Sequence, residues 1–166
     1  DERQQSSAGK VVGWYNGDDD LKMCGDKFTF RRLINQEDEL LEKAHDFIQF
    51  LFPTDKPSEF NRQAPTFSSK DFRLIRLDRA RNAFQRVQEF YQRTNEWKQQ
   101  NDHNDRRISR ILRFLRLMGL NDEADEFYDF VIMNKPNHGR EVERHWKKAN
   151  ESIHSSPPVS NQDDLE

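Results

Sequence analysis

The sequence predicts an all-α fold, a compact single-domain bundle of about six helices with flexible termini. Apolar residues recur three or four positions apart in about six separate stretches, the spacing of a helix with one buried face. No stretch alternates apolar and polar residues as a half-buried strand does. The chain has 166 residues and thirteen Phe, enough for one aromatic-rich core although only 33% of its residues are hydrophobic.

The predicted helical domain covers residues 11 to 152 and lies between two tails. These tails, residues 1 to 10 and 153 to 166, are polar, rich in Ser, Gln and Asp, and have no periodic apolar face. Such composition favours disorder, because too little apolar surface is available for burial. A first short helix is expected around residues 29 to 35.

The next helix, residues 37 to 52, is expected to be the buried centre of the bundle. Its apolar face is broad, and Phe50 and Phe52 lie outside that face. The end of the helix is therefore apolar nearly all round and must be covered from several sides. Pro53 ends it, because proline disfavours helical dihedrals at the preceding residue. A proline-rich loop follows up to residue 68.

Four further amphipathic helices complete the prediction. Gly119 is placed as the C-terminal cap of the second of them, since glycine readily adopts the left-handed conformation that ends a helix. Their expected bounds are residues 69 to 93, 104 to 118, 122 to 133 and 140 to 151.

Charge is unevenly distributed along the chain. The net charge is -3, yet residues 70 to 118 carry thirteen basic and six acidic side chains. Clustered guanidinium groups favour phosphate contacts, so a nucleic-acid interface is one interpretation. The other is pairing with acidic segments of the same domain. The candidate residues for an anionic partner are Arg79, Arg86, Arg106, Arg110 and Arg113.

The sequence shows no motif for catalysis, for a cofactor or for a metal. It has no glycine-rich phosphate loop, no nucleophile elbow and no zinc-binding histidine spacing. The single Cys24 forms no internal disulfide, which favours a reducing, intracellular location such as the cytoplasm. No apolar run approaches the roughly 20 residues of a membrane span. We therefore expect a binding protein rather than an enzyme.

Residues 45 to 53 read HDFIQFLFP and resemble the H-D-Y-I-Q-W-L-F-P signature of the opioid growth factor receptor conserved region. Phe50 stands where that signature has Trp. The similarity extends over about residues 12 to 150. Further positions similar to the family are Leu40, Glu42, Pro57, Ser58, Asn61, Ala64, Pro65, His103, Asn104, Arg107 to Leu112, Leu115, Gly119, Leu120 and Trp146 to Ala149.

This resemblance implies binding of a peptide such as methionine-enkephalin or of a protein, growth regulation, and a nuclear or perinuclear location. A peptide's cationic amino end needs a carboxylate, and its aromatic side chains need an apolar slot. We predict His45, Asp46, Gln49 and Asn61 as the ligand-binding residues. His45 and Gln49 have an alternative interpretation as core polar residues with satisfied hydrogen bonds.

Overall fold

The regular structure of the described residues is helical, which confirms the predicted all-α class. Apart from two isolated bridges, Met23 to Phe28 and Thr54 to Thr66, this part of the chain contains no strand pairing. The computed structural model describes residues 2 to 44, 46 to 58, 64 to 99, 103 to 135 and 139 to 151.

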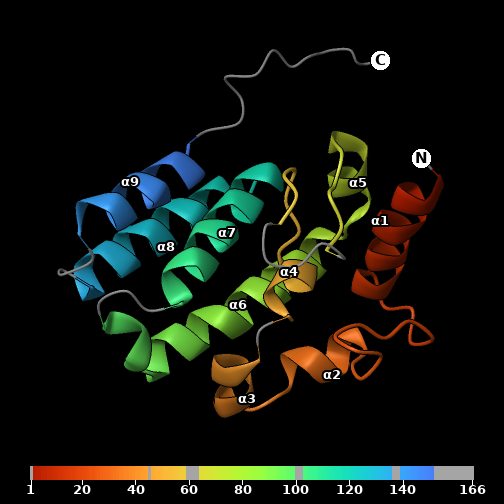
Figure 1. Cartoon of the computed structure of the whole chain (residues 1–166), viewed down its shortest axis with the longest axis horizontal. Helices are drawn as coiled ribbons and strands as arrows, with labels where there is room; N and C mark the ends of the chain where they lie inside the picture. The colour runs from red at the N-terminus through yellow and green to blue at the C-terminus, as the bar shows by residue number, and fades with distance from the viewer. Residues whose placement is uncertain (1, 45, 59–63, 100–102, 136–138, 152–166) are drawn as a thin grey trace.

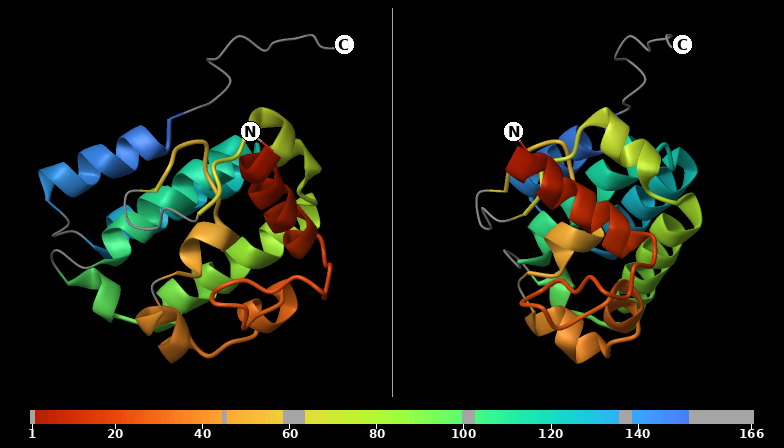
Figure 2. Two further views of the ribbon diagram at one scale, coloured as in Figure 1. Left: turned by 45° about the vertical axis from the view of Figure 1, so that its right-hand side comes forward. Right: turned by 90° about the vertical axis from the view of Figure 1, so that its right-hand side faces the viewer.

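The helices enclose one continuous hydrophobic core (Figure 1). α7, α8 and α9 lie side by side, α6 crosses the molecule beside them, and α1 packs on α5 at the other end. α4 lies near the centre in all three views (Figures 1 and 2). The elements are α1 (Glu2–Tyr15), α2 (Phe30–Ile34), α3 (Asp38–Lys43), α4 (Ile48–Leu51), α5 (Ser69–Leu74), α6 (Leu77–Arg93), η1 (Glu96–Lys98), α7 (Asn104–Leu117), α8 (Asn121–Asn134) and α9 (Arg140–Ala149).

The N-terminal segment differs from the prediction of a loose tail over residues 1 to 10. Residues 2 to 10 form the first part of α1, and Ala8 is buried. Trp14 and Tyr15, near the end of the same helix, are completely buried. The large aromatic surface of these two residues explains why α1 is part of the core. The other predicted tail, 153 to 166, lies outside the described residues.

The predicted single helix over residues 37 to 52 is wrong, because the chain bends in the middle of it. α3 ends at Lys43, Ala44 is extended with ψ 138°, and α4 forms only one turn. The predicted burial is nevertheless confirmed. Phe47, Ile48, Leu51 and Phe52 are each no more than 4% exposed.

The helix expected over residues 69 to 93 is also divided, into α5 and α6. Ile75 lies between them, extended with ψ 130° and buried. Asn16, at the end of α1, bridges the break: its Nδ2 donates to the Leu74 carbonyl at 2.8 Å, and its Oδ1 accepts from the Arg76 amide at 2.9 Å. A side chain far away in sequence therefore satisfies the backbone groups that the break frees.

The helices near the C-terminus follow the prediction closely. Gly119 has φ +77° and ends α7, where the Leu120 amide donates to the Leu115 carbonyl at 2.8 Å. This is the bonding expected of a glycine cap. α9 is joined to α7 through Trp146, which is fully buried and donates from Nε1 to the Asp105 carbonyl at 2.9 Å.

Candidate functional site

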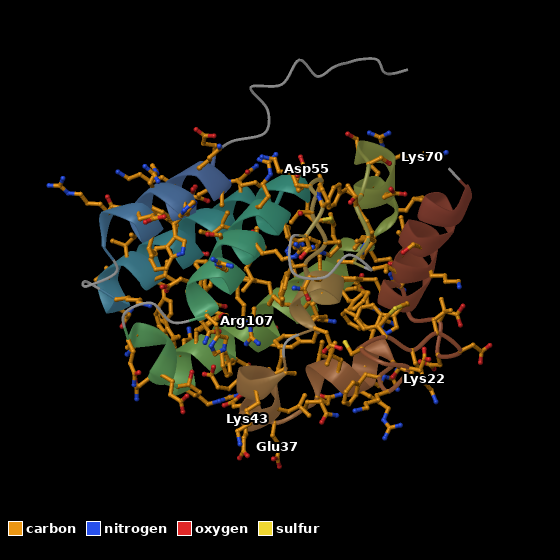
Figure 3. All side chains as sticks on the ribbon, viewed as in Figure 1. Lys22, Glu37, Lys43, Asp55, Lys70 and Arg107 are labelled. Carbon is orange, nitrogen blue, oxygen red and sulfur yellow. The ribbon has the colours of Figure 1, made fainter. Side chains whose placement is uncertain are left out.

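The bend between α3 and α4 is held by Arg107 of α7, which Figure 3 shows near the centre of the molecule. Its Nη1 donates to the Leu41 carbonyl at 2.7 Å, and its Nη2 donates to the Ala44 carbonyl. The guanidinium group also lies over the Phe47 ring, 5.0 Å from the ring centroid. The last carbonyls of a helix lack intrahelical donors. Arg107 supplies them for α3.

The other end of this segment is held in the same way. The Tyr15 hydroxyl donates to the Leu51 carbonyl at 2.8 Å, and Arg110 Nε donates to the Phe52 carbonyl at 2.8 Å. A helix of one turn has little stability of its own, because nucleation is costly. α4 is therefore stabilised by side chains of α1 and α7.

Arg110 is satisfied less completely than Arg107. Its Nη2 is buried and has no hydrogen-bond partner. Burial lowers the pKa of the guanidinium to about 10, so the group still carries its charge at neutral pH. The result is a desolvated cation at the junction of α4 and α7.

Two of the predicted ligand-binding residues lie on this same segment, and the structure places them differently. Asp46 is exposed, whereas Gln49 is only 8% exposed. The Oε1 of Gln49 is buried and has no hydrogen-bond partner. Gln49 is thus not the satisfied core residue of the alternative interpretation. His45 and Asn61 lie outside the described residues.

Asp46 also affects the only cysteine of the chain. Burial, and secondarily the charge of Asp46, raise the pKa of the Cys24 thiol to about 12. The thiolate is the nucleophilic form of cysteine. The Cys24 thiol is therefore protonated at neutral pH. Separately, the backbone of Cys24 has an unusual positive φ of 60°.

The arginines that were predicted as an anionic-partner surface mostly contact groups of this chain. On α7, Arg113 donates to both carboxylate oxygens of Asp55, at 2.9 and 3.3 Å. Arg116, which is on the same helix but was not among the predicted residues, binds Asp125 and the backbone carbonyl of Asn150. Arg106 is exposed. The charge of α7 is thus largely used inside the domain.

The same holds for the arginines of α6. Arg86 and Arg93 both bind the Asp38 carboxylate, and Arg86 also donates to the Gln36 carbonyl at 2.6 Å. The hydrogen bond from Arg93, followed by contacts with Arg86, holds the pKa of Asp38 below its usual value. These residues line an open depression beside α2 and α3. Arg79 lies over the Phe30 ring, 5.5 Å from its centroid.

Several buried polar residues were not predicted as functional. Asn104 accepts a hydrogen bond from the Tyr91 hydroxyl at 2.9 Å and donates to Glu42 at 3.1 Å. Lys135 has a fully buried side chain paired with Asp105. Glu42 and Asn104 fall on positions of the family motif, and this resemblance was the one sequence feature that could have marked them as functional. Lys135 lies in no motif and no pattern of the sequence indicates its burial.

The described residues offer no group of three or more His, Cys, Asp or Glu side chains that could hold a metal ion. In the same part of the chain, no helix is long and apolar enough to cross a membrane. Comparison of the chain with protein-family models, with curated proteins and with solved structures gave no match.

Proposed function

We propose that this chain is a non-enzymatic module that binds a peptide or protein partner at the segment formed by Asp46 and α4. The observation that carries the proposal is the unused hydrogen-bonding capacity of this segment. Asp46 presents an exposed carboxylate, and three residues later Gln49 has a buried acceptor without a donor. Buried polar atoms in proteins are nearly always paired, so an exception needs an explanation. We take binding of a partner as that explanation here.

These two side chains suit the chemistry of a peptide. An exposed carboxylate attracts a cationic amino end, and the Oε1 of Gln49 is an acceptor for a backbone N–H group. Phe50, the residue directly after Gln49, is only partly buried and supplies apolar surface. A short peptide with a free amino end and aromatic side chains, such as methionine-enkephalin, has these complementary groups.

The contacts between distant motif positions also support the resemblance to the opioid growth factor receptor region. Leu41 and Ala44 flank Glu42 near the first motif stretch, and all three contact the Asn104 to Arg107 turn of the second. The resemblance extends the proposal to growth regulation, and to a location inside the cell at or near the nucleus.

Calorimetric titration of the full chain with methionine-enkephalin tests the proposal. We expect saturable binding that Asp46→Asn weakens by about tenfold or more, because a hydrogen bond to a charged group contributes roughly 1.5 to 3 kcal/mol. N-acetylation of the peptide, which removes its positive charge, should have a similar effect. Asp19→Asn is the matched control, since Asp19 is exposed in the loop between α1 and α2.

Absence of heat with the unmodified peptide would reject this ligand. Equal affinities for the wild type and Asp46→Asn would reject the role of Asp46. Nucleic-acid binding through the arginines is the alternative, but it has weaker support because Arg86 and Arg113 are already paired with acidic side chains.

A further inference from the structure

Arg110 differs from the other arginines of α7 in what its guanidinium group contacts. Arg107 reaches two backbone carbonyls and Arg113 forms a two-point ion pair with Asp55. Arg110 has one hydrogen bond, from Nε to the Phe52 carbonyl, and its Nη2 is buried without an acceptor. No ion pair joins Arg110 to an acidic side chain in the described part of the chain. Among the arginines of α7 in the described part of the chain, only Arg110 has a buried nitrogen without an acceptor; on α6, Nη1 of Arg86 is buried without one too, but Arg86 is paired with Asp38.

Such an arrangement is unfavourable in the free protein. A buried charge needs both a partner charge and hydrogen bonds to offset its desolvation. Arg110 is mostly buried and lacks the partner charge. Arg110 nevertheless keeps part of its surface exposed, so a ligand can approach the residue, although the Nη2 atom itself is buried.

A hydrogen-bond acceptor without a donor lies on α4, the one-turn helix that ends just before Phe52. Gln49 belongs to α4, and Phe52, whose carbonyl binds Arg110, is the residue directly after this helix. The Phe52 carbonyl is already bound to Arg110, while Gln49 Oε1 has no donor. The junction of α4 and α7 thus holds a donor and an acceptor that both lack partners.

We propose that Arg110 binds the free carboxylate at the C-terminal end of a peptide, with Gln49 Oε1 accepting the last backbone N–H of that peptide. A carboxylate is planar and singly charged, and it matches one guanidinium group. Phosphate recognition generally uses several cations, whereas the neighbouring Arg113 is taken by Asp55. This inference rests on the proposal that the chain binds a peptide at α4, although it does not depend on enkephalin.

The test uses small probes and the full chain. N-acetylphenylalanine carries the carboxylate, the N–H and an aromatic ring, and its carboxamide lacks only the charge. We expect the acid to shift the side-chain Nε–Hε resonance of Arg110 in a saturable way, and the carboxamide to shift it at least tenfold less. The resonance is assigned by its loss in Arg110→Met, and the Nε–Hε of Arg113 is the internal control.

Equal responses to the acid and the carboxamide, or no response to either, would overturn the inference. A saturable response to inorganic phosphate but not to the acid would overturn the carboxylate assignment. These outcomes are independent of Asp46, so they separate a failure here from a failure of enkephalin binding.

A second measurement excludes a purely structural role. We expect Arg110→Met to lower the urea midpoint of unfolding less than Arg113→Met does, because Arg113→Met leaves the partly buried Asp55 without its partner. A larger loss for Arg110→Met would show that the main role of Arg110 is to hold the end of α4, and would overturn its assignment to a ligand.

Discussion

Arg107 stabilises this fold through the shape of its guanidinium group. The group is only slightly exposed and lies over the Phe47 ring while it donates to the Leu41 and Ala44 carbonyls. A planar fork can reach two carbonyls at once, which a single ammonium group does less well. The side chain therefore replaces the helical hydrogen bonds that the bend at Ala44 removes.

Arg107→Met should cost about 2 to 4 kcal/mol of unfolding free energy, because it leaves two carbonyls near the centre of the molecule without donors. Chemical denaturation of both proteins measures this loss. The control is Arg31→Met, at an exposed position of α2, where we expect a change within about 0.5 kcal/mol.

Arg107→Lys refines the same experiment. It keeps the positive charge but loses the fork, so most of the destabilisation of Arg107→Met should remain. If the lysine variant instead has the same unfolding free energy as the wild type, then the bend requires the positive charge and not the forked geometry.

The helices of this chain differ in what ends them. α7 ends by a local signal, because Gly119 adopts a positive φ of 77° that other residues rarely take. α3 and α5 end without a local signal, and backbone carbonyls near their ends accept hydrogen bonds from Arg107 and Asn16. The first kind of boundary is a property of the sequence, and the second depends on tertiary contacts.

A pair of glycine substitutions tests this distinction at the local boundary. Gly119→Ala should destabilise the protein by about 1 kcal/mol, because the left-handed conformation is strained for alanine. Gly9→Ala, in the ordinary helical backbone of α1, should instead stabilise it by up to about 1 kcal/mol. Neither added methyl group meets an atom within 4 Å, so packing does not complicate the comparison.

Thermal unfolding measures both variants, and each change should move the midpoint by roughly 2 to 4 °C. The two shifts should have opposite signs. A fall of similar size for Gly9→Ala would mean that residue 9 is not part of a helix in solution.

Aromatic side chains form two clusters, each of which connects several helices. Tyr15 of α1 lies 4.7 Å from Phe30 and 6.1 Å from Phe114, measured between ring centroids, so α1, α2 and α7 share one cluster. Tyr91 connects α6 to Trp97 at 5.4 Å and to Phe127 of α8 at 5.9 Å. In the described part of the chain, the buried residues of both clusters belong to one hydrophobic core.

We therefore expect a single cooperative unfolding transition. The chain has three tryptophans, all fully buried: Trp14 in α1, Trp97 in η1 and Trp146 in α9. Variants that keep one tryptophan and replace the other two by phenylalanine report on each region separately. In each variant the fluorescence midpoint in urea should equal the midpoint from far-ultraviolet circular dichroism. A lower fluorescence midpoint for the Trp14 reporter would show that α1 detaches before the rest unfolds.

The sequence by itself determined the helical class, the bounds of the last three helices to within a few residues, and the burial of Phe47, Ile48, Leu51 and Phe52. These features follow from apolar spacing and from a glycine cap, which act between residues close together in the chain. Of the predicted ligand residues, it could identify Asp46 and Gln49 only through a family motif. It could not show that one is exposed and the other buried.

Only the tertiary structure decided that the stretches 37 to 52 and 69 to 93 each divide into two helices. Breaking a helix frees backbone carbonyls and amides, and the cost depends on whether a donor or acceptor lies nearby. Here Arg107 and Asn16 supply those groups from more than fifty residues away. The same physical reason explains why the sequence did not predict the partners of the arginines. A guanidinium group binds whichever carboxylate or carbonyl the fold brings to it.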